Sequence, residues 1–130
     1  MTKEEFVQHV KSDTLPMYRL AYSILQNSAD AEDAVSEAIV HAYEKLDTLK
    51  KADSFRNWIL QIAANEAKKI YRQNKRTSPV EWEENLSPEF YDEHHELWDA
   101  VMQLDGGYRD VIVLFYYERC TIPEISRILE

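Results

Sequence analysis

The chain has 130 residues, with 15 Lys and Arg against 24 Asp and Glu, which gives a formal net charge of −9. Apolar residues make up 45% and charged residues 30%, so the composition is that of a folded chain and not of a disordered one. The length allows one domain or two very small ones, and two glycines are too few for a turn-rich β-sandwich or barrel. A charge of −9 argues at first against nucleic-acid binding, but its distribution along the chain alters that conclusion.

The N-terminal part of the chain is predicted to form three helices. Thr2 and Glu5 have the spacing of a capping box and open a short first helix. A second helix is expected to start near Thr14, with Pro16 in its first turn, where proline is tolerated. A third follows over residues 30–46, where apolar residues recur at i, i+3 and i+4.

A polar loop over residues 47–54 precedes a fourth helix, expected from its cap at Ser54 to about Arg72. Its apolar stripe includes Trp58, which we assign to the core because buried aromatic residues usually serve packing. Residues 55–76 carry six basic side chains and one acidic, a local charge of +5. These cations could neutralise phosphates or simply face solvent, and composition leaves the two interpretations even.

Residues 77–105 contain nine acids and no Lys or Arg, and their prolines indicate a linker over 77–92. A second helical unit is expected over 93–130, with a break at Gly106-Gly107 and a last helix opened by a Thr121/Glu124 capping box. The sequence therefore predicts an all-α fold with two small helical units, 1–76 and 93–130, joined by the acidic linker.

No pattern in the sequence indicates catalysis. Asp33, Glu37 and His41 share one helix face and could ligate a metal, but the Glu-x-x-His pairs of a four-helix carboxylate site are absent. Such an acidic face more often docks on a basic partner helix. Cys120, as the single cysteine, excludes an internal disulfide and fits a reducing, cytoplasmic compartment. We expect no enzyme activity, cofactor, metal or membrane insertion, and keep a metal-dependent helical hydrolase as a third interpretation.

Two segments together resemble the second conserved region of bacterial sigma-70 family RNA polymerase sigma factors, and most closely the extracytoplasmic-function (ECF) group: MYRLAYSILQNSADAEDAVSEAIVHAYEKL and SFRNWILQIAANEAKK. A third segment resembles the start of the family's fourth region: YRDVIVLFYYERCTIPEISRILE, in which IPEISRIL would be the first helix of a helix-turn-helix. The resemblance covers nearly the whole chain.

The resemblance implies two binding surfaces. One would bind the clamp helices of the core RNA polymerase beta-prime subunit through Asp33, Ser36, Glu37 and Val40. The other would recognise the −10 promoter element, including a flipped non-template base, through the loop 47–54 and the side chains of Arg56, Asn57, Gln61 and Asn65. Backbone phosphates would be contacted by Lys68, Lys69 and Arg72. The acidic linker would pass toward the path of the nascent RNA.

The sequence departs from the family pattern at two places. Residues 104–107 read Leu-Asp-Gly-Gly where the family often has Leu-Pro, and the basic helix that reads the −35 element would have to follow Leu129. We interpret the sequence as a shortened chain or a natural truncation within region 4. The predicted function is that of an ECF sigma factor that binds core polymerase and recognises and melts the −10 element, with an anti-sigma protein as a further partner. The alternative is a sigma-like mimic or decoy that binds an anti-sigma protein without promoter recognition.

Overall fold

The computed structural model describes residues 1–50, 55–77 and 95–130, and these ranges contain helices and no strand. The elements are α1 (Lys3–Leu25), α2 (Ser28–Glu44), η1 (Leu46–Thr48), α3 (Phe55–Thr77), α4 (His95–Met102), α5 (Gly106–Ile112), η4 (Val113–Tyr117) and α6 (Ile122–Leu129). The predicted all-α class is therefore confirmed. The expected linker lies almost wholly outside the described residues, and the unit boundaries 1–76, 77–92 and 93–130 remain a prediction.

Helix α1 is continuous through Pro16, so the prediction of two separate helices here was wrong. Proline removes one backbone hydrogen bond and costs a helix interior about 3 kcal/mol. Burial on both sides of it offsets this cost, because Phe6 packs its ring 5.8 Å from that of Phe55 while Met17 and Leu20 are completely buried. Breaking the helix at Pro16 would withdraw one of these anchors from the core.

A tight corner joins α1 to α2. Gln26 has a left-handed backbone (φ 56°), and its N–H donates to the Tyr22 carbonyl at 2.8 Å, which ends α1. Asn27 then caps α2, because its side-chain oxygen accepts the Asp30 N–H at 2.9 Å. Helix α2 turns a row of fully buried small residues toward its neighbours, namely Ala31, Ala34, Ala38 and Ala42. With no side chain beyond Cβ in this row, α1 and α3 can both approach α2 closely.

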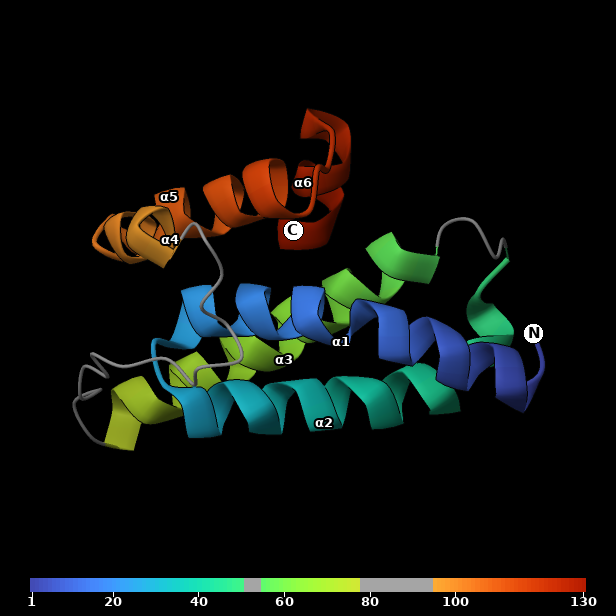
Figure 1. The fold of residues 1–130 in the computed structure, drawn as a ribbon. Coiled ribbons are helices and arrows are strands. Elements are labelled where there is room, and N and C mark those ends of the chain that lie inside the picture. The colour runs from blue at the N-terminus through green and yellow to red at the C-terminus, as the bar shows by residue number, and fades with distance from the viewer. Residues whose placement is uncertain (51–54, 78–94) are drawn as a thin grey trace.

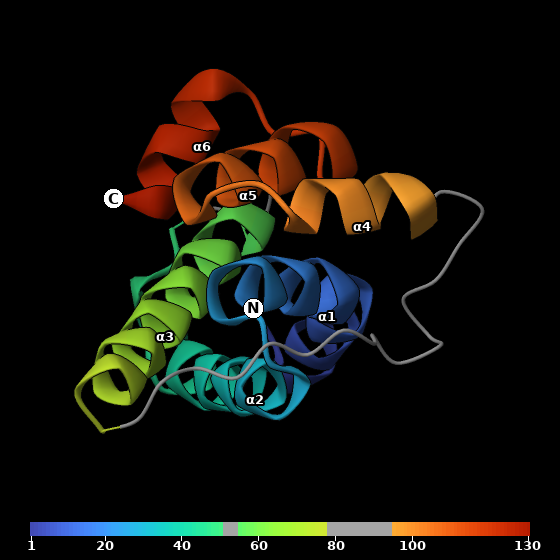
Figure 2. The ribbon, with the colours of Figure 1, turned by 90° about the vertical axis from the view of Figure 1, so that its left-hand side faces the viewer.

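Helices α1, α2 and α3 form a three-helix bundle, and α4, α5 and α6 lie across α1 and α3 on the side opposite α2 (Figures 1 and 2). The two parts share one apolar core, to which Trp98, Leu114 and Ile128 contribute from the C-terminal side. Trp98 packs against Tyr22 of α1 with ring centres 6.3 Å apart. The apolar stripe of α6 is likewise covered, since Ile125 and Ile128 are buried where α6 packs on α3.

Candidate nucleic-acid interface

Helix α3 has an apolar face toward the bundle and a polar face away from it. The apolar face is fully buried at Ile59, Leu60, Ala63, Ala64 and Ala67. The seven residues predicted to contact DNA lie outside this stripe, but they fall into two groups. Asn65, Lys69 and Arg72 are exposed, whereas four are partly covered: Arg56, Asn57, Gln61 and Lys68.

The C-terminal segment makes the polar contacts to three of the covered residues. Asn57 donates from Nδ2 to Oε2 of Glu124, and Lys68 donates from Nζ to the Leu129 carbonyl. Helix α6 is held for these contacts by its capping box, in which Thr121 N–H donates to Glu124 Oε1 at 2.7 Å. The Asn57 and Thr121 hydrogen bonds also lower the pKa of the Glu124 carboxyl, with the Thr121 backbone N–H as the larger cause, so Glu124 stays anionic.

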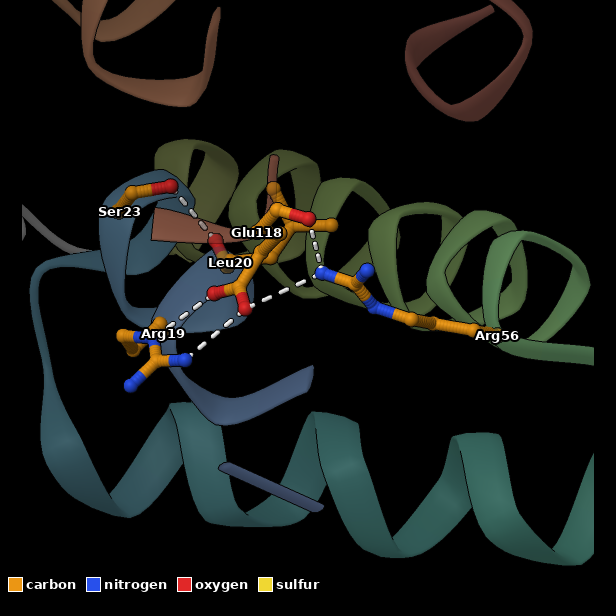
Figure 3. A network of polar contacts seen from close by, with 5 residues as sticks. All are labelled: Arg19, Leu20, Ser23, Arg56 and Glu118. Atoms are coloured by element: carbon orange, nitrogen blue, oxygen red, sulfur yellow. Dashed lines mark hydrogen bonds and ion pairs between the residues drawn. The ribbon is translucent and has the colours of Figure 1, made fainter. Parts of the chain in front are cut away.

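Glu118 connects the third covered residue to α1 (Figure 3). Its side chain is 2% exposed, and both carboxylate oxygens accept from Arg19, at 2.7 Å from Nε and 2.9 Å from Nη2. Arg56 Nη2 donates to the Glu118 carbonyl oxygen and lies 3.4 Å from Oε1. Such a bidentate, charge-assisted pair is geometrically specific, so it fixes the chain after η4 against both α1 and α3.

A cleft of about 300 Å³ lies between the turn after α2, the start of α3 and α6. Leu49 and Lys50 contribute from the turn, Asn57 and Gln61 from α3, and α6 forms part of the wall. The cleft thus gathers part of the loop 47–54 and two predicted −10 contacts, while residues 51–54 lie outside the described ranges. Asn65, predicted beside the flipped base, is not among the lining residues of this cleft.

The residues predicted to bind polymerase lie together on the outer face of α2. Asp33, Ser36, Glu37 and Val40 are all exposed, and α2 lies on the far side of the bundle from α4, α5 and α6 (Figures 1 and 2). His41 is turned toward α3, where its Nδ1 lies 2.6 Å from Glu66 Oε1. In the described part of the chain, no three His, Cys, Asp or Glu side chains are grouped so as to hold a metal ion.

The chain matches the family model described as "Sigma-70 region 2" over residues 11–77. The chain belongs to the sigma-70 family, in its ECF group. It is 28% identical over 131 residues to RNA polymerase sigma factor SigV of Bacillus subtilis, covering 98% of this chain and 79% of that protein. It is also 29% identical over 132 residues to ECF RNA polymerase sigma factor SigW of the same organism, covering 87% and 71%.

As a sigma factor, the chain is a transcription initiation protein of a DNA-binding family. Its region 2 match spans α3 and all seven predicted DNA-contacting residues, as well as the outer face of α2. The individual roles of those residues remain predictions. None of the helices in the described ranges is long and apolar enough to cross a membrane.

Glu118, Glu124 and Arg19 take part in the interface around α3, and sequence reasoning missed all three. One signal was present for Arg19, which lies between Tyr18 and Leu20 in a stretch that is buried on nearly every side. A charge in such a stretch needs a partner. For Glu118 no local pattern gave a signal, because its two arginine partners are 99 and 62 residues away in sequence.

Proposed function

We propose that this sigma factor binds core RNA polymerase through the outer face of α2 and recognises the −10 promoter element with the polar face of α3. The proposal is supported by the separation of the two groups of residues. The exposed acids Asp33 and Glu37 lie on one side of the bundle, and the basic residues of α3 lie outside that face. Both partners could therefore be bound at once, as transcription initiation requires.

The chemistry of α3 suits single-stranded or melted DNA. Lys69 and Arg72 are exposed cations one turn apart, which suits neighbouring phosphates along a strand. Asn65 is exposed one turn before Lys69, and its amide can both donate to and accept from the edge of an unstacked base. The acidic face of α2 would in turn complement a basic helical partner and accelerate its association.

Holoenzyme assembled from the full chain and core RNA polymerase tests the −10 assignment. Labelled non-template DNA strands of mixed sequence are titrated, and Asn65→Ala should weaken binding about tenfold, as expected for one lost base contact. Gln8→Ala, which removes an exposed amide from α1, serves as the control and should bind like the wild type. Equal affinity of the Asn65 variant and the wild type would contradict the assignment.

The salt dependence of the same titration tests the phosphate contacts. Lys69→Ala/Arg72→Ala should lower the slope of log affinity against log salt by about 1.4, since each single-strand phosphate contact contributes about 0.7. The matched control is Lys11→Ala/Lys45→Ala, which removes two exposed cations from the other side of the bundle. If the two double variants changed the slope equally, the effect would come from net charge and not from this surface.

The mimic or decoy remains a second candidate, and the coverage of Arg56, Asn57 and Lys68 by the C-terminal segment favours it. A protein that binds only an anti-sigma protein would need no free α3 surface. Reconstituted transcription with core polymerase separates the two functions. Promoter-specific transcripts support the sigma factor, whereas a protein that binds core or an anti-sigma protein but yields no transcript supports the mimic.

A further inference from the structure

We propose that residues 118–129, which we call the clasp, act as an autoinhibitory element that covers part of the α3 surface and must be released before DNA binds fully. The proposal rests on the proposed function of α3. It starts from the observation that three of the seven predicted DNA-contacting side chains already have partners within the chain. Arg56, Asn57 and Lys68 all donate to oxygen atoms of the clasp or of Glu118 at its start.

The clasp presents these side chains with the chemistry that DNA would present. Arg56 binds a carbonyl and a carboxylate oxygen of Glu118, in place of phosphate oxygens. Asn57 donates to the Glu124 carboxylate, in place of a base edge or phosphate. Because each donor group can be occupied by only one acceptor set, DNA and the clasp compete for the same atoms.

Charge and shape strengthen the competition. Glu124 lines the cleft together with Asn57 and Gln61, so its negative charge lies where a phosphate would have to enter. Ile125 and Ile128 are 5% and 1% exposed beneath α6, so the clasp is held by apolar burial as well as by polar contacts. Removing α6 from α3 therefore carries a cost that the binding energy of DNA must offset.

The coverage is partial, which determines the expected behaviour. Asn65, Lys69 and Arg72 remain exposed and could hold a strand weakly while the clasp is in place. Release would add Arg56, Asn57 and Lys68 to the interface. The apparent affinity of the closed protein is reduced by the fraction of molecules that are open, and any variant that raises this fraction strengthens DNA binding.

The test compares substitutions of one residue type on one helix. Ile125→Ala/Ile128→Ala removes buried contacts of α6, whereas the control Ile122→Ala alters a side chain that is 64% exposed on the same helix. Mixed-sequence fluorescent single-stranded DNA is titrated into each full-length protein, alone and with core polymerase. We expect the double variant to bind about tenfold more tightly if roughly one wild-type molecule in ten is open, and the control to bind like the wild type.

Two further measurements guard against a trivial result. Glu124→Gln removes the charge but keeps an oxygen for the Thr121 N–H, so α6 stays capped, and we expect affinity to rise about threefold. Adding Arg56→Ala to the double variant should abolish most of its gain. By reciprocal linkage, saturating DNA should also accelerate hydrogen exchange at the Ile125 amide, whose N–H donates to the Thr121 carbonyl in the closed form.

The outcomes separate the clasp from the proposed function. Equal affinity of the wild type and the Ile125→Ala/Ile128→Ala variant, with binding still dependent on Asn65, overturns the clasp and leaves the proposed function standing. A gain that survives Arg56→Ala overturns the clasp as well, because it would come from an unfolded α6. Failure of every variant to bind DNA, with or without core polymerase, overturns the proposed function and the clasp with it.

Discussion

Asp110 is predicted to make stability depend on pH at the junction of α5 and α1. Its carboxylate lies 2.9 Å from Ser23 Oγ, and burial raises its pKa from 3.8 to about 6, with the Ser23 hydrogen bond and Arg109 acting in the opposite direction. The folded chain thus binds this proton more tightly than the unfolded chain. The stabilising contribution is complete below about pH 4 and is lost as pH rises through about 6.

The magnitude follows from the pKa. A tenfold change in proton affinity corresponds to about 1.4 kcal/mol, so a pKa raised from 3.8 to about 6 corresponds to roughly 3 kcal/mol between the two ends of the titration. About half of this remains at pH 5. Asp110→Asn removes the titration and keeps an amide that can hydrogen-bond with Ser23. The free energy of unfolding of the variant, relative to wild type, should therefore rise by about 3 kcal/mol from pH 4 to pH 7.5.

Urea unfolding followed by far-ultraviolet circular dichroism measures this difference, at low protein concentration because the isoelectric point is near 4.9. Taking the difference between variant and wild type cancels the titration of the other acids. Asp99→Asn, an exposed acid on α4, is the matched control and should show no pH-dependent difference. If the difference for Asp110→Asn were the same at both pH values, the carboxyl would not be buried in the folded chain as described.

Two further substitutions test the packing. Arg19→Ala should lower the free energy of unfolding by about 3 kcal/mol in urea titrations, because it leaves the buried Glu118 carboxylate without its bidentate partner, and an unchanged midpoint would contradict that pairing. Ala38→Leu should cost about 1–3 kcal/mol by overpacking the fully buried side of α2, measured as a lower melting temperature, whereas Val40→Leu on the exposed side should be nearly neutral.

Local sequence patterns predicted most of the helices because caps and apolar periodicity act over a few residues. The Thr2 and Thr121 caps are present in the structure, and α2 ends at Glu44, close to the expected end at Leu46. Pro16 misled the prediction because the burial that holds α1 together comes from other helices. Trp58 is partly buried with its ring 5.8 Å from that of Phe55, in keeping with its assignment to packing.

The pattern on α3 identified a polar face but not its neighbours within the chain. An amphipathic helix specifies which side faces the core and leaves open what covers the other side. The contacts of Arg56 and Asn57 join residues 62 and 67 positions apart, and they depend on how α6 docks. Resemblance to a family gives those side chains an external partner, and the internal competitor becomes visible with the fold.

The widened turn η4 sets where length variation can be tolerated in this chain. There the Glu118 N–H bonds to the Val113 carbonyl five residues earlier, at 3.2 Å, so the turn holds one residue more than an α-helix would. Deleting a single residue from 113–117 would rotate everything that follows by about 100°. Glu118 would then miss both of its arginine partners at once. Among related chains, insertions and deletions should therefore be rarer in this short segment than its partly exposed surface alone suggests.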